Sequence, residues 1–159
     1  MRKMDWWNHR TVRVWIALSL AILMQGPPAG RSEQNIRRIR VVVNGLKKQL
    51  GITEEIRTAV VKRNNRVVSV RPVDNHRRVF EILFEEGFFD MLDDEELYAV
   101  VAHEMGHVWI YTHHPYLQTE DLANDIAYKA VSTDAMDRIY EKLRARQAII
   151  SPLEASMRD

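Results

Sequence analysis

The sequence contains no cysteine, which excludes disulfide bonds and any metal site built from thiolate ligands. It also has almost no excess charge, because 23 lysines and arginines balance 22 aspartates and glutamates and leave a formal net charge of +1. This balance gives no reason to expect a nucleic-acid partner. Internal repeats and low-complexity segments are absent as well. What is present is a chain of 159 residues, long enough for one compact domain with a hydrophobic core.

Residues 1–30 have the layout of a secretory signal peptide. A basic segment at residues 1–13 precedes the apolar run VWIALSLAILM at residues 14–24, and the small and helix-breaking residues GPPAG follow. The run is short for a membrane span. Because prolines occupy the positions before the small residues, an uncleaved N-terminal membrane anchor is the alternative prediction. Either reading predicts that the rest of the chain is exported, to a periplasmic or secreted location.

Residues 31–151 are predicted to form one α+β domain, and residues 152–159 a loose tail. Apolar residues at spacings of three and four predict the following helices: 33–50, 92–112, 116–131 and 134–150. Runs rich in β-branched and aromatic residues predict the following strands: 56–61, 67–70 and 78–84. Asn64-Asn65 between the first two strands is a hairpin signal, so we expect a small antiparallel sheet packed on the helices.

The helix expected at residues 92–112 carries the only clear chemistry in the chain. Asp93 and Glu96 have the spacing of a capping box, in which each side chain accepts a hydrogen bond from the backbone N–H of the other residue. Apolar or small residues occupy nearly all of its circumference. A helix of this kind is central in its domain and is covered on both sides.

Residues 103–107 of this helix read His-Glu-Met-Gly-His, the H-E-x-x-H pattern. His103 and His107 lie four residues apart, so both imidazoles can reach one metal ion. Glu104 is adjacent and can face a metal-activated water as the general base. Two helical histidines and a salt-bridging glutamate are the simpler reading of so short a pattern. Burial favours a metal, because buried imidazoles and carboxylates need partners, and we predict one zinc ion per chain.

A catalytic zinc site needs a third protein ligand, and His113, His114 and Glu120 follow downstream. His113 fits the longer pattern H-E-x-x-H-x-x-G-x-x-H, but the glycine of that pattern is replaced by Ile110, which favours continued helix. Glu120 fits a length argument, because a helix that returns antiparallel at about 1.5 Å per residue reaches the level of the metal there. Asn124, one turn further, can orient a ligating histidine. We therefore predict Glu120 as the third ligand.

Residues 84–108, FEEGFFDMLDDEELYAVVAHEMGHV, resemble the strand-to-active-helix segment of the zinc metallopeptidases that include the prenyl-protein and heat-shock membrane proteases. Residues 120–124 resemble the E-x-x-A-D motif that carries the third zinc ligand of that family. The resemblance implies a zincin-like fold of the gluzincin type. His103, His107 and Glu120 would then bind zinc, and Glu104 would act as the base.

The chain departs from the family in two ways. Asn124 stands where the family has aspartate, and the link between the two motifs is far shorter, without the intervening helices and membrane spans. We therefore expect a minimal, soluble-domain version, in which membrane contact is limited to an uncleaved N-terminal anchor. The strand near residues 79–84 is predicted to pair with an extended peptide or protein substrate.

The function predicted from these residues is zinc-dependent peptide-bond hydrolysis. A metal-stabilised binding protein without turnover is the alternative from another class, and the intact Glu104 speaks against it. Hydrolysis of a non-peptide amide is a third possibility. The donor that would stabilise the oxyanion is left open among four residues: Tyr111, His113, His114 and Tyr128.

Overall fold

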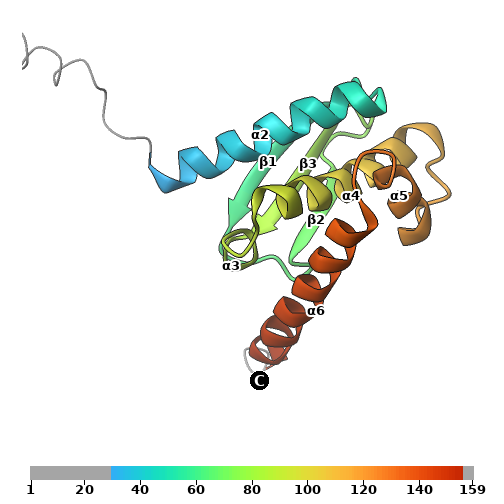
Figure 1. Ribbon diagram of the computed structural model, residues 1–159. Helices are drawn as coiled ribbons and strands as arrows, with labels where there is room; N and C mark the ends of the chain where they lie inside the picture. The colour runs from blue at the N-terminus through green and yellow to red at the C-terminus, as the bar shows by residue number, and fades with distance from the viewer. Residues whose placement is uncertain (1–29, 156–159) are drawn as a thin grey trace, which may run out of the picture. The chain divides into compact units, whose positions relative to one another are not determined.

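The computed structural model describes residues 30–155 of the chain (Figure 1). The predicted signal peptide or anchor therefore lies outside the described residues apart from Gly30, as do the last four residues of the predicted tail. The elements follow in this order: α2 (Arg31–Leu50), β1 (Glu55–Val61), β2 (Val68–Pro72), β3 (Val79–Glu85), α3 (Glu86–Phe89), α4 (Asp94–His113), α5 (Glu120–Ala127) and α6 (Thr133–Ala155). Within this part of the chain, no helix combines the length and apolarity of a membrane span.

The three strands form one mixed sheet in the order β1-β3-β2. The last strand, β3, lies in the middle, parallel to β1 and antiparallel to β2. The α+β class is confirmed, but the prediction of an antiparallel sheet with a hairpin at Asn64-Asn65 is wrong. Asn64 is instead tied to the central strand, because its side-chain amide donates to the carbonyl of Leu83 at 2.9 Å. The strand β2 is left with one free edge.

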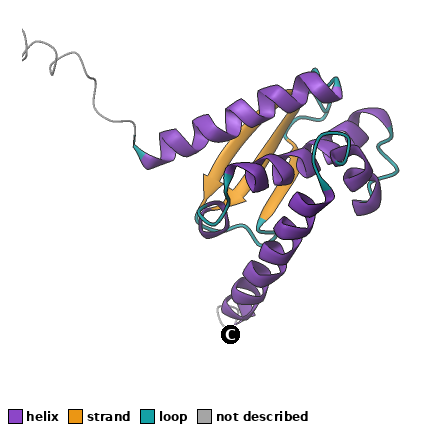
Figure 2. Ribbon diagram, viewed as in Figure 1, coloured by secondary structure: helices purple, strands orange, loops and turns teal. Residues whose placement is uncertain are grey.

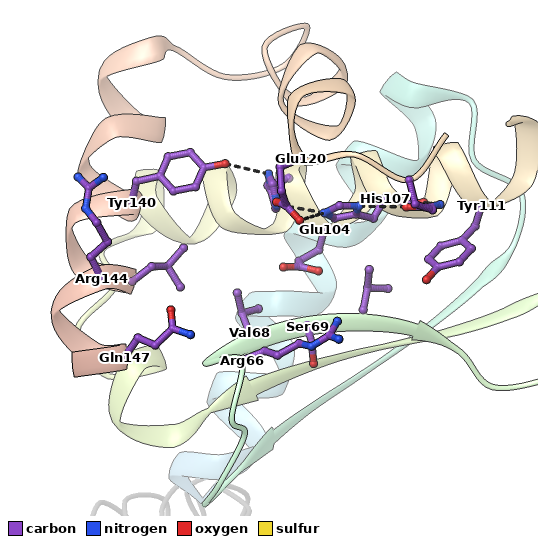
Figure 3. A pocket seen from close by; sticks show the side chains of 14 residues that line it. Arg66, Val68, Ser69, Glu104, His107, Tyr111, Glu120, Tyr140, Arg144 and Gln147 are labelled. Atoms are coloured by element: carbon purple, nitrogen blue, oxygen red, sulfur yellow. Dashed lines mark hydrogen bonds and ion pairs between the residues drawn. The ribbon is translucent and has the colours of Figure 1, made fainter. Parts of the chain in front are cut away.

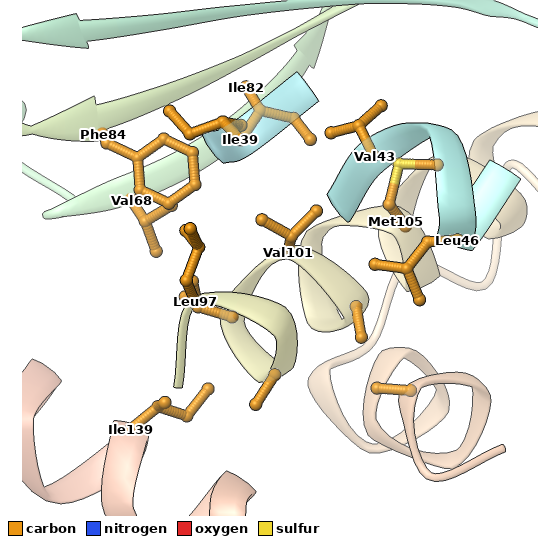
Figure 4. Close-up of a cluster of buried hydrophobic side chains, with 14 of the residues drawn as sticks. Ile39, Val43, Leu46, Val68, Ile82, Phe84, Leu97, Val101, Met105 and Ile139 are labelled. Atoms are coloured by element: carbon orange, nitrogen blue, oxygen red, sulfur yellow. The ribbon is translucent and has the colours of Figure 1, made fainter. Parts of the chain in front are cut away.

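One face of the sheet forms the core, together with α2 and α4 (Figure 4). Side chains of β3 alternate in burial, so Phe80, Ile82 and Phe84 face these two helices and are fully buried. On the other face, Glu81 pairs with Arg71 of β2 near solvent. Figure 2 shows the helices gathered on one side of the strands. A sheet with one covered face explains the alternation of burial along β3.

Helix α4 is the central helix that the sequence predicts. The capping box is confirmed: Asp93 accepts from the backbone of Glu96 at 2.8 Å, and Glu96 accepts from the backbone of Asp93 at 2.9 Å. The helix continues through Ile110 to His113, as a β-branched residue at that position predicts. It packs against the sheet on one side and against α5 and α6 on the other.

Two helices have bounds that differ from the predicted ones. The helix expected at 116–131 covers only Glu120–Ala127, because Thr119 caps its start by accepting from the backbone N–H of Leu122. The preceding residues form a loop instead of the predicted helical return. Helix α6 extends to Ala155, past its predicted end at Ser151-Pro152.

Ion pairs to two buried carboxylates attach α6 to the rest of the domain. Lys142 lies 2.6 Å from the buried carboxylate of Glu96, and Arg146 binds both oxygens of Glu85 at 2.7 and 2.8 Å. Burial alone would raise the pKa of Glu85, but hydrogen bonds from Arg146 and from the backbone of Phe88 outweigh it and lower the pKa below its usual value. These contacts fix the position of α6 relative to α4 and β3.

Candidate metal centre

Three predicted ligand side chains converge beside α4. The Nε2 atoms of His103 and His107 lie 3.2 Å apart, and the Glu120 carboxylate lies 3.1 Å from the first and 3.5 Å from the second. Among the described residues, these three form the one group of histidines and carboxylates able to share a metal ion, with donor atoms within 4.8 Å of one another. His103 is buried, whereas the Glu120 side chain is 73% exposed, so the centre opens to solvent on the side of α5.

The hydrogen bonds behind the histidines fix which ring nitrogens carry protons. The Nδ1 atom of His103 lies 2.8 Å from Oδ1 of Asn124, and that of His107 lies 3.2 Å from Oε1 of Gln118. Both amide oxygens can only accept, so each Nδ1 carries the proton and donates. The Nε2 lone pairs therefore point toward Glu120.

This arrangement fits a zinc ion. Ligands at about 2.0–2.1 Å from a tetrahedral zinc lie about 3.3–3.4 Å from one another, close to the three separations of 3.1, 3.2 and 3.5 Å. Without a cation, two nitrogen lone pairs and a carboxylate would face one another with no proton donor between them. A set of two imidazoles and one carboxylate is also a typical donor set of catalytic zinc.

Close contact between α4 and α5 positions Glu120 and Asn124. The backbone of Ala123 lies directly against Gly106, where any side chain would collide with it. Glu120 and Asn124 flank Ala123 on α5 and reach His103 from the same side. The glycine of the H-E-x-x-H segment thus permits the approach that brings the third ligand to the other two.

The side chain of Glu104 points into a cleft between α4 and β2 (Figure 3). Burial, followed by the negative charge of Glu120, raises its pKa to about 8. A hydrogen bond from the backbone N–H of Val70 acts in the opposite direction and lowers it. A cation held by the three ligands would also favour the ionised carboxylate, which is the form that accepts a proton.

His113 does not join this cluster. Its ring stacks on Trp109 at 4.2 Å with an angle of 6° between the planes, and its Nδ1 donates to the Trp109 carbonyl at 2.9 Å. Of the four residues considered as oxyanion donors, Tyr111 alone is among those that line the cleft. The sequence offers no signal that distinguishes Tyr111 from the other three candidates. Which of them lines the cleft depends on how α4 is oriented toward β2.

Several residues of the site were not predicted from the sequence. Gln118 lies in the α4–α5 loop and holds His107, while Tyr140 of α6 donates its hydroxyl to Oδ1 of Asn124 at 2.7 Å. Arg66 and Arg144 line the cleft as well. No local pattern marks these residues, since they come from separate elements; only the tertiary fold brings them together.

The fold and the site define the class: an α+β domain whose central helix presents an H-E-x-x-H pair next to a downstream glutamate is a zincin-type metallopeptidase domain. The chain belongs to peptidase family M48, whose model matches residues 75–157. This confirms the resemblance to the prenyl-protein and heat-shock membrane proteases and makes the protein a zinc metallopeptidase by family. Comparison with curated proteins and with solved structures gave no match. The match includes every predicted ligand, whereas α2, β1 and β2 precede it.

Proposed function

We propose that the protein hydrolyses peptide bonds with one zinc ion held by His103, His107 and Glu120, and with Glu104 as the general base. The observation that carries this proposal is the convergence of the three ligand side chains at the spacing of tetrahedral zinc ligands. A bound zinc ion supplies Lewis-acid chemistry, because it polarises a carbonyl group and makes water more acidic.

In this mechanism Glu104 handles the proton. The carboxylate accepts a proton from the attacking water as the water oxygen bonds to the carbonyl carbon of the substrate. It then returns the proton to the nitrogen of the leaving amine as the C–N bond breaks. Glu104 lines the cleft but is not among the three side chains whose donor atoms could share a metal ion, which supports this role over a ligand role.

The substrate backbone is proposed to lie along β2. The prediction that the strand at residues 79–84 receives the substrate is wrong, because β3 is paired on both sides. Of the two edge strands, β2 is the one that lines the cleft, and the N–H of Val70 on that strand already points to the carboxylate of Glu104. An extended peptide that added to this edge would place its backbone next to the base.

The test uses purified full-length protein loaded with zinc. About one zinc per chain and cleavage of a peptide mixture, detected by mass spectrometry, are expected, and chelation should stop cleavage. Glu104→Gln should retain zinc but lose about 10²–10⁴-fold in rate. Glu141→Gln, an exposed glutamate on α6, is the matched control and should cleave normally. Bound zinc without any cleavage would favour a metal-stabilised binding protein instead.

We further propose that the domain works outside the cytoplasm, on the basis of the basic and apolar pattern at residues 1–30. Fractionation of an expressing bacterial host and N-terminal sequencing of the product test this proposal. Recovery of intact chain from the cytoplasmic fraction would contradict it.

A further inference from the structure

Two arginines line the cleft. Arg66, just before β2, and Arg144, on α6, line the same cleft as Glu104, and Figure 3 shows Arg66 beside Ser69 of β2 and Arg144 on the α6 wall near Tyr140. The acidic residues that line the cleft, Glu104 and Glu120, belong to the catalytic centre. We call Arg66 and Arg144 the cleft arginines. The two residues are 78 positions apart, so the fold alone creates this group.

Neighbouring cations on α6 have acidic partners, whereas Arg144 has none among the described residues. Arg138 pairs with Glu95, and Lys142 and Arg146 pair with the buried Glu96 and Glu85. Within the described part of the chain, neither Arg144 nor Arg66 forms an ion pair. Both guanidinium groups therefore keep their hydrogen-bond donors available to a ligand in the cleft.

The backbone that presents Arg66 is strained. Val67 has a φ of 68°, and the N–H of Val68 donates to the carbonyl of Arg66 at 2.7 Å across it, which is a rare γ-turn. Asn64 secures the turn, since its side chain accepts from the N–H of Arg66 at 3.1 Å and donates to β3. Val67 is fully buried. A β-branched residue in this conformation costs free energy, so the packing around it holds Arg66 in place at the cleft.

The charges in the cleft favour an anionic ligand. The two glutamates and two arginines that line it cancel, so a bound divalent zinc ion leaves an excess of two positive charges. A guanidinium group binds a carboxylate through two parallel hydrogen bonds. The carboxylates that a peptide offers are acidic side chains and its own C-terminus.

We propose that the cleft arginines bind carboxylates of the peptide substrate and give the enzyme a preference for acidic peptides. This inference rests on the proposed peptidase function. Because Arg66 directly precedes β2, a substrate aligned on the β2 edge would place its carboxylate at a fixed number of residues from the bond that is cleaved. Arg66 lies outside the segment that the family model matches.

The experiment profiles cleavage of a peptide library by the zinc-loaded full chain. If a side-chain carboxylate is bound, cleaved peptides are expected to carry Asp or Glu at one fixed distance on one side of the cut. If the C-terminal carboxylate is bound, they are expected to be cut at a fixed distance from the C-terminus. A peptide pair that differs only by Glu against Gln, or by a free against an amidated C-terminus, then gives rates. Arg66→Gln and Arg144→Gln should each slow cleavage of the carboxylate peptide by about 10–100-fold and leave the neutral one nearly unchanged.

Arg71→Gln is the matched control, because Arg71 lies on β2 but pairs with Glu81 on the other face of the sheet. It should leave the preference intact. A binding measurement with zinc-loaded Glu104→Gln separates this inference from the proposed function: the carboxylate peptide should bind about 10-fold or more tightly than its neutral partner, and Arg66→Gln should remove the difference. Cleavage or binding without an acidic preference, or a preference that survives both arginine substitutions, would overturn the inference and leave the peptidase proposal standing. Absence of any cleavage would overturn the peptidase proposal. The binding measurement would still decide whether the two arginines bind a carboxylate of the peptide.

Discussion

Gly106 of α4 lies so close to Ala123 of α5 that a Cβ atom on the glycine would be 2.5 Å from the alanine carbonyl oxygen. The contact lies between the two histidines of α4 and the two α5 residues that face them, Glu120 and Asn124. The distance between the helices therefore controls the geometry of the proposed metal centre.

We expect Gly106→Ala to push α5 away from α4. The free energy of unfolding should fall by about 1–3 kcal/mol, the usual cost of overpacking, and zinc should bind more weakly because Glu120 moves with α5. Denaturant unfolding and competitive zinc titration measure the two effects. Gly45→Ala is the matched control: nothing lies within 4 Å of its added Cβ in α2, so it should stabilise the protein by about 0.5–1 kcal/mol. Unchanged zinc affinity in Gly106→Ala would show that the contact between Gly106 and Ala123 does not control the geometry of the metal centre.

Substitution of Glu120 and substitution of His113 are expected to affect zinc binding differently. Glu120→Ala removes a proposed ligand and should weaken zinc binding by more than about 100-fold, beyond the loss typical of a residue that only supports a ligand. His113→Ala should retain zinc, because the His113 ring stacks on Trp109 instead of facing the other histidines. Competition with a chromophoric chelator measures both variants. Loss of zinc from His113→Ala alone would contradict the ligand set.

Tyr140 is predicted to support the metal centre through Asn124. Its hydroxyl and the Nδ1–H of His103 donate to the same oxygen of Asn124, at 2.7 and 2.8 Å. Asn124→Ala should weaken zinc binding about 10–100-fold, and Tyr140→Phe by a smaller factor. The double variant should be no weaker than Asn124→Ala, because both act through one oxygen. Tyr98→Phe, whose hydroxyl contacts Gln49 on another side of α4, should bind zinc normally.

Additive losses in the double variant would mean that Tyr140 acts independently of Asn124. Asn124→Asp is a further probe, since a carboxylate can accept from both donors and also carries the charge of the family motif. It should bind zinc at least as tightly as the unmodified chain.

The ion pair between Glu85 and Arg146 should make the free energy of unfolding depend on pH. The pKa of Glu85 is lowered in the folded protein. The ionised Glu85 side chain therefore contributes fully to the free energy of unfolding above the usual pKa of a glutamate. This contribution is lost as the pH falls through the lowered value. Glu85→Gln should reduce the free energy of unfolding by about 1–3 kcal/mol at neutral pH and by less in acid. Urea unfolding at pH 7 and pH 4 measures the difference. Glu55→Gln breaks an exposed pair with Arg57 and should change little at either pH.

The sequence by itself determined the central helix and its chemistry. A capping box, an apolar circumference and the H-E-x-x-H spacing are local features, and local hydrogen bonds and helical periodicity produce them wherever the helix lies. The position of Glu120 beside the two histidines was also predicted, because few residues separate α4 from Glu120 and a short link limits where α5 can lie. The helical return assumed for that link was wrong, although the position of Glu120 was not affected.

The tertiary structure alone decided the strand order and the walls of the cleft. Strand pairing joins residues that are distant in sequence, so the turn residues Asn64-Asn65 could not reveal that β3 lies between β1 and β2. The edge strand beside the cleft is therefore β2, and the substrate strand predicted from the sequence was the wrong one. Tyr140, Arg66 and Arg144 likewise acquire their roles only when α6 packs beside β2 and α4. Local propensity determines a helix and its ligand spacing, whereas long-range packing determines what those ligands face.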